Sequence, residues 1–124
     1  MDQITHWING ALDTSKPERS GDIYNPATGK ATKSVAFGNA ATVDRAVNAA
    51  SIAFAEWRHS SLTKRTQVLF AFRELVAQNK EKIAALITDE HGKVLSDAAG
   101  EVTRGLEVVE FACGIPHLLK GGYS

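Results

Sequence analysis

The residue best suited to act as a nucleophile in this sequence is its single cysteine, Cys113. A reactive thiolate needs a neighbouring base or the positive end of a helix. Cys113 instead falls near the carboxyl end of a predicted helix, where the helix dipole disfavours a negative charge. It continues an apolar stripe whose members are three or four positions apart: Leu95, Ala99, Val102, Leu106 and Val109. We therefore predict that Cys113 is a small buried hydrophobic residue and not a nucleophile.

A second candidate, Arg104, lies on a neighbouring stripe of the same predicted helix. Spacings of three and four positions place it with Asp97, Glu101, Val108 and Phe111. One interpretation is an ion pair with Glu101, which would contribute only tenths of a kcal/mol on a surface. The other is a guanidinium held beside Val108 and Phe111 that binds a ligand carboxylate through two hydrogen bonds. The residues by themselves leave both interpretations open and favour the ion pair.

No other group of residues indicates catalysis or cofactor binding. The sequence lacks the glycine-rich loops that cradle nucleotide phosphates and the Gly-x-Ser-x-Gly elbow of serine hydrolases. We expect no metal site, because no two of the histidines are four positions apart: His6, His59, His91 and His117. The charged cluster 89–91, followed by Lys93, is interpreted as a solvated helix end.

Composition narrows the class of partner. The 124 residues include 14 basic and 14 acidic side chains, so no net field attracts nucleic acid or an anionic membrane. No apolar run approaches the ~18 residues of a membrane span, and the first residues lack the pattern of a secretory signal. A single cysteine fits a reducing compartment. We expect a cytoplasmic protein with no nucleic-acid or membrane partner.

The first third of the chain is expected to form strands. Two antiparallel β-hairpins are predicted within residues 5–36, with strands near 5–13 and 22–36. Asn9 and Gly10 form the dipeptide that most readily makes a two-residue hairpin turn. Pro26 and Gly29 mark a second turn, between segments rich in tyrosine, threonine, valine and phenylalanine.

The rest of the chain is expected to be helical, which makes the fold class α+β. Apolar residues recur at helical spacing and predict three long amphipathic helices, over about 43–58, 61–91 and 94–113. Thr42 is the expected N-cap of the first helix. A break near Asn79 is an alternative to one continuous second helix, and Gly92 is expected to end it.

The order of these landmarks resembles the N-terminal part of the aldehyde dehydrogenase superfamily. The matching segments span nearly the whole chain: WINGA (7–11), YNPATGK (24–30), VDRAVNAASIAFAEW (43–57), KRTQVLFAFRELV (64–76), EHGKVLSDAAGEV (90–102) and FACGIPHLLKG (111–121). Single segments are weak signals, whereas the ordered series is specific. Within the superfamily, the later segments look most like the CoA-acylating, methylmalonate-semialdehyde dehydrogenase branch.

The resemblance implies that the chain is the first part of a multidomain enzyme of about 500 residues. Residues 1–124 would form the N-terminal part of its NAD-binding domain and carry no catalytic, cofactor-binding or metal-binding residue. The family's cysteine nucleophile would lie beyond Ser124, and residues 121–124 read as interrupted chain. The parent would use NAD and CoA, and the segment would contact the rest of its own chain and identical subunits.

The resemblance also changes the interpretation of Arg104. In the family, the corresponding helix borders the aldehyde tunnel. The substrates of this branch, methylmalonate and malonate semialdehyde, carry a carboxylate and are converted to propanoyl-CoA and acetyl-CoA by oxidative decarboxylation. Arg104 would anchor that carboxylate, and Val108 and Phe111 would form part of the tunnel wall.

Two alternatives stay open at this point. The chain could come from another branch of the superfamily, or it could be a small, non-enzymatic helical module that binds a partner. A protein of about 13 kDa in the cell, the mass of this chain alone, would favour the module. As part of an enzyme, the segment by itself is expected to be inactive and to expose apolar helix faces.

Overall fold

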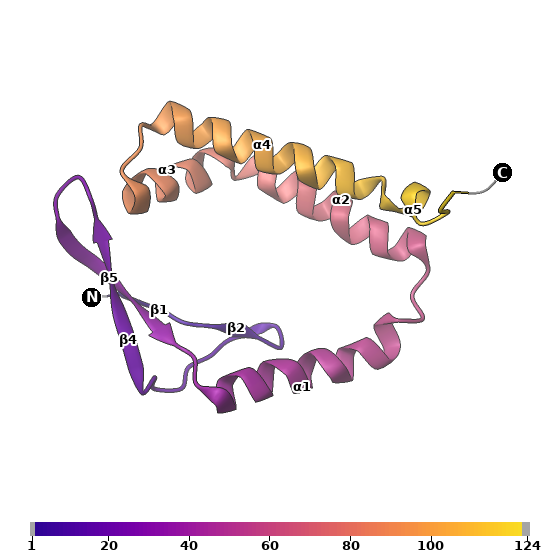
Figure 1. Cartoon of the computed structure of the whole chain (residues 1–124), viewed down its shortest axis with the longest axis horizontal. Coiled ribbons are helices and arrows are strands. Elements are labelled where there is room, and N and C mark those ends of the chain that lie inside the picture. The colour runs from indigo at the N-terminus through magenta and orange to yellow at the C-terminus, as the bar shows by residue number, and fades with distance from the viewer. Residues whose placement is uncertain (1, 123–124) are drawn as a thin grey trace. The chain divides into compact units, whose positions relative to one another are not determined.

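The computed structural model describes residues 2–122; Tyr123 and Ser124, part of the expected interrupted ending, lie outside the described residues. The chain divides into two compact units, Met1–His59 and Ser60–Ser124. Strands precede helices along the chain, so the expected α+β fold class is confirmed (Figure 1).

The first unit contains a three-stranded sheet in the order β1-β5-β4. β4 (Arg19–Asn25) and β5 (Lys30–Phe37) form an antiparallel hairpin, as expected (Figure 1). Its turn ends at Gly29, whose φ of 66° is a conformation that glycine adopts at little cost. β1 (Asp2–Ile4), which lies before the predicted strands, pairs with β5 in parallel, whereas both predicted hairpins are antiparallel. A strand of three residues has too few positions to show periodicity.

A smaller hairpin follows β1. β2 (Trp7–Ile8) and β3 (Ala11–Leu12) pair antiparallel. Asn9 and Gly10 form its turn with φ values of 52° and 76°, the two positive angles of a type I′ turn. The strands are shorter than the expected segment 5–13. The chain turns away at Asp13, because a carboxylate oxygen of Asp13 accepts a hydrogen bond from the Ser15 N–H (3.0 Å).

α1 (Ala40–Trp57) begins three residues before the predicted start at 43. Its N-cap is Asn39 and not Thr42, a correction to the sequence-based expectation. The Asn39 side-chain oxygen accepts hydrogen bonds from the Thr42 N–H (3.0 Å) and the Thr42 hydroxyl (3.0 Å). Asparagine is among the strongest N-cap residues, and alanines at the first two helical positions extend the helix at low cost. No residue of α1 is buried.

The second unit is helical. Its elements are α2 (Leu62–Gln78), α3 (Lys80–His91), α4 (Leu95–Cys113) and the short α5 (Ile115–Leu118). The segment 61–91 forms two helices because Asn79 leaves helical geometry, with φ −105° and ψ 12°. Gly92 ends α3 in the left-handed region, with φ 85°. The three expected helices therefore correspond to α1, the pair α2 and α3, and α4. The short α5, with Pro116 in its first turn, was not predicted.

α4 packs against both α2 and α3 (Figure 1). The centre of this packing is Ala84 of α3 with Ala98 and Val102 of α4, exposed by 1%, 0% and 7%. Partly buried residues surround it: Val76, Ile83, Ile87 and Ala99. Small side chains at the contact let helix axes approach closely. No large side chain in the described part of the chain is fully buried.

The accessible surface is large for the mass of the chain. It measures 9277 Å², whereas two separate compact proteins sharing this mass would together expose about 7,800 Å². Large apolar side chains contribute to the excess, including Trp7 (68%), Ile52 (67%) and Phe54 (57%). Apolar surface of this extent is typical of faces that contact other protein.

Gly92→Ala is expected to lower the free energy of unfolding by about 1 kcal/mol, because alanine at a positive φ is strained. The matched control is Gly105→Ala inside α4, where a Cβ would meet nothing within 4 Å. That change is expected to raise the free energy of unfolding by about 0.5–1 kcal/mol. Thermal unfolding followed by circular dichroism, at equal chain concentrations, measures both. Shifts of the same sign would contradict the role of the left-handed turn.

Candidate functional site

The three residues singled out as a substrate site lie on α4. Arg104, Val108 and Phe111 are all exposed, and helical spacing puts them on one face. Glu101, one turn before Arg104, is partly buried. The described structure therefore presents a guanidinium and two apolar side chains together on an open helix face.

The ion pair between Glu101 and Arg104, which was the alternative interpretation of Arg104, is not formed. Glu101 instead accepts a hydrogen bond from the ammonium of Lys93, which lies just before α4. This hydrogen bond is the main cause that holds the pKa of Glu101 below its ordinary value of 4.5. Smaller Coulombic contributions come from Lys93, Arg104 and His91. The sequence did not reveal this pairing, because Lys93 precedes α4 and is eight positions from Glu101, so helical spacing does not relate the two.

Arg104 differs from the other arginines of the chain. Arg45 pairs with Asp13, and Arg73 pairs with Glu110 (2.7 Å). The guanidinium of Arg19 lies 6.0 Å from the centre of the Phe37 ring, and Arg58 and Arg65 also have interactions. Within residues 2–122, the side chain of Arg104 forms no hydrogen bond, close ion pair or ring contact. Its donors are available to an anion.

The remaining faces of α4 follow the sequence-based expectation in most respects. Cys113 is buried, which confirms its assignment as a small hydrophobic residue. Glu107 and Glu110 are exposed, whereas Thr103 is partly buried. Glu110 also accepts two hydrogen bonds from Arg73 of α2, at 3.0 and 2.7 Å. This ion pair, which the sequence did not reveal, ties α4 to α2.

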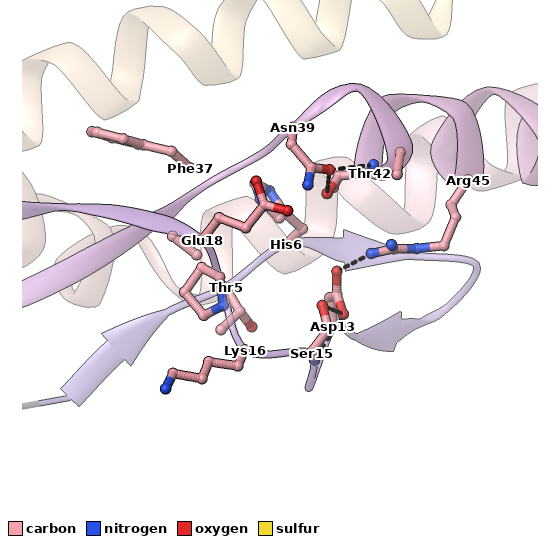
Figure 2. A pocket seen from close by; sticks show the side chains of 13 residues that line it. Thr5, His6, Asp13, Ser15, Lys16, Glu18, Phe37, Asn39, Thr42 and Arg45 are labelled. Atoms are coloured by element: carbon pink, nitrogen blue, oxygen red, sulfur yellow. Dashed lines mark hydrogen bonds and ion pairs between the residues drawn. The ribbon is translucent and has the colours of Figure 1, made fainter.

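A cavity of about 170 Å³ within the first unit was not foreseen from the sequence (Figure 2). Its polar lining includes Thr5, His6, Asp13, Lys16, Glu18, Asn39 and Arg45. Hydrogen bonds from Ser15 to Asp13 hold the pKa of that carboxyl below its ordinary value, and Arg45 adds a smaller contribution of the same sign. The cavity is lined by charges of both signs. Among its described lining residues, Arg45 and Asp13 form a close ion pair and so neutralise each other (Figure 2). We assign no chemistry to it.

The described residues offer no further candidate for metal chemistry. Over residues 2–122, no group of three or more histidine, cysteine, aspartate or glutamate side chains is arranged to hold a metal ion. Within the same residues, no helix has the length and apolar character needed to cross a membrane.

Comparison with known sequences places this chain among aldehyde dehydrogenases. Residues 12–123 match the sequence model of the aldehyde dehydrogenase family. The malonate-semialdehyde dehydrogenase of Pseudomonas aeruginosa is 46% identical over 124 residues, and that of Bacillus velezensis is 41% identical over 119 residues. These alignments cover 100% and 96% of this chain but 25% and 24% of the relatives. The chain thus spans about a quarter of the length of these relatives.

Solved structures give the same result. The crystal structure of methylmalonate-semialdehyde dehydrogenase from Oceanimonas doudoroffii matches with a TM-score of 0.93 and 47% identity, over 98% of this chain and 25% of that one. A structure from Sinorhizobium meliloti 1021 in complex with NAD matches with a TM-score of 0.90 and 37% identity, over 95% and 24% of the two chains.

Proposed function

Because this chain belongs to the aldehyde dehydrogenase family, we propose that the full-length protein carrying it oxidises malonate or methylmalonate semialdehyde. The reaction would use NAD and CoA and release acetyl-CoA or propanoyl-CoA with loss of the carboxylate as carbon dioxide. Support comes from the curated relatives named for malonate semialdehyde, at 41–46% identity. The single structural observation that supports this branch is the unpaired guanidinium of Arg104 on α4.

In this proposal, the residues of this chain help to bind the substrate but provide no reactive group. The cysteine nucleophile of the family has no counterpart among them, since Cys113 is buried on the packed side of α4. The described residues also contain no dinucleotide cradle, so the NAD and CoA sites would be built by the rest of the full-length protein. When bound, NAD accepts the hydride of the aldehyde carbon, and the CoA thiol takes up the acyl group. These 124 residues would therefore act as scaffold and as one wall of the substrate site.

Arg104 is the residue of this chain that would select the substrate. A guanidinium binds a carboxylate through two parallel hydrogen bonds, which fixes both position and orientation. Once the site is closed, an aldehyde without the acid would leave this charge desolvated and unpaired, and would therefore be rejected. Val108 and Phe111, exposed beside it on α4, would shield the short carbon chain of the substrate from water.

The exposed apolar faces define the expected partners. The described residues leave large side chains uncovered on α1, α2 and α4. We propose that the remainder of the protein's own chain and identical subunits cover these faces. The single cysteine and the balanced charge fit a cytoplasmic enzyme.

The proposed reaction is tested with the purified full-length protein. We expect NADH formation with malonate or methylmalonate semialdehyde, and acyl-CoA as product when CoA is present. Faster turnover of propanal, with free acid as the product, would place the protein in another branch of the family. A natural protein of 13.3 kDa that oxidises neither semialdehyde would instead favour a non-enzymatic module.

A further inference from the structure

The segment that joins α3 to α4 brings a lysine against Glu101, which lies one helical turn before Arg104. Gly92 turns the chain in the left-handed region, with φ 85°, and Lys93 follows it directly. The ammonium of Lys93 donates a hydrogen bond to an Oε1 of Glu101. The Lys93 side chain is only 20% exposed, and that of Glu101 is 41% exposed. The pair is therefore partly shielded from solvent.

Glu101 can compete with a substrate for the guanidinium of Arg104. The two residues are three positions apart on α4, a spacing at which side chains of opposite charge meet on a helix. Arg104 is among the charges that lower the pKa of Glu101, after Lys93. A carboxylate tethered on the same helix has a high effective concentration, so it would compete with any dissolved carboxylate. A substrate would have to displace it before binding.

We propose that Lys93 is a positioning residue that holds Glu101 away from Arg104 and so keeps the guanidinium available for a substrate carboxylate. The inference rests on the proposed function, in which Arg104 binds that carboxylate. The geometry supports the division of roles: Glu101 accepts from Lys93, while Arg104 forms no close ion pair within residues 2–122. The direction of the Glu101 pKa shift, caused mainly by Lys93, is consistent with the same arrangement.

The inference is tested by Lys93→Met in the full-length protein, a change that keeps much of the stem and removes the charge. Glu101 is then expected to turn to Arg104. The KM for malonate semialdehyde should rise about 2- to 5-fold, as an exposed ion pair allows. The kcat should change little, and the KM for propanal should stay constant because propanal has no carboxylate.

Two further variants separate positioning from general damage. In Lys93→Met/Glu101→Gln the competing charge is gone, so the KM for malonate semialdehyde should return to the unmodified value. Lys93→Arg preserves the cation and should keep the KM near that value. Equal rises in KM for both aldehydes, or a double variant that stays as impaired as Lys93→Met, would overturn the inference.

Arg104→Ala distinguishes the failure of this inference from the failure of the proposed function. If Arg104→Ala impairs both aldehydes equally, Arg104 is no carboxylate anchor, and both proposals fall. If Arg104→Ala impairs only the acid-bearing aldehyde and Lys93→Met changes neither KM, the anchor stands and the positioning role of Lys93 is rejected.

Discussion

Arg104→Ala in the full-length protein is expected to lower kcat/KM for malonate semialdehyde by about 30- to 1000-fold, while kcat/KM for propanal stays within about twofold. The change removes two hydrogen bonds between charged groups, which together contribute about 2–4 kcal/mol. Propanal forms neither of them. The ratio of the two kcat/KM values isolates carboxylate binding from effects on the reacting centre. Steady-state rates of NADH formation with both aldehydes measure it.

Two controls sharpen the interpretation of Arg104. Arg104→Lys keeps the positive charge but offers a single point of contact, so an intermediate loss is expected. Arg73→Ala removes an arginine that is already engaged by Glu110 and Glu74. It should reduce stability by loosening α2 against α4 and leave the preference between the two aldehydes unchanged. Equal losses on both aldehydes for Arg104→Ala would contradict its assigned role.

Local sequence signals predicted the helical part of the fold well. The spacing of apolar residues located α4 to within one residue, and the same stripe identified Cys113 as a packed residue. Turn chemistry was equally informative: Asn9 and Gly10 form their hairpin turn, and Gly92 ends α3 with a positive φ. These features depend on interactions between near neighbours in sequence, which a single chain displays directly.

Features formed between distant segments were not predictable from one sequence. The parallel pairing of β1 with β5 depends on backbone groups, which every residue has. Glu101 pairs with Lys93 although Arg104 and His91 are also nearby, and Arg73 pairs with Glu110 of another helix. Surface ion pairs differ from one another by less than about 1 kcal/mol, so spacing alone does not select among them. Spacing therefore did not reveal that the side chain of Arg104 is unpaired, which is the most useful observation for the candidate site.

The burial pattern explains why the amphipathic stripes could be located but not the surfaces they face. Leu95, on the same stripe as the buried Val102 and Cys113, is 55% exposed. Val68 and Leu75 of α2 are likewise 55% and 57% exposed. An apolar stripe shows that a helix face is built for contact, and it contains no information about what makes that contact. Part of the hydrophobic pattern of these residues therefore has no partner within the described residues.

The 124-residue chain, produced alone, is therefore expected to self-associate at micromolar concentration and to bind a hydrophobic dye. Its accessible surface of 9277 Å² exceeds what compact units of this mass expose, and exposed apolar side chains drive association. Sedimentation velocity should give species heavier than 13.3 kDa, growing with concentration. A monodisperse monomer that binds no dye would show that these faces need no cover.

The variant Val47→Glu/Phe54→Lys tests whether the apolar face of α1 is responsible. Val47 and Phe54 are 58% and 57% exposed, so polar replacements there cost little folding free energy while removing contact area. Association should weaken clearly. The matched control, Asn48→Glu/Ser51→Lys, adds the same two charges to exposed positions of α1 and removes no large apolar side chain. If both double variants weaken association equally, charge is the cause and the apolar face is not. If only the first does so, the apolar face of α1 drives association, as the proposed function expects.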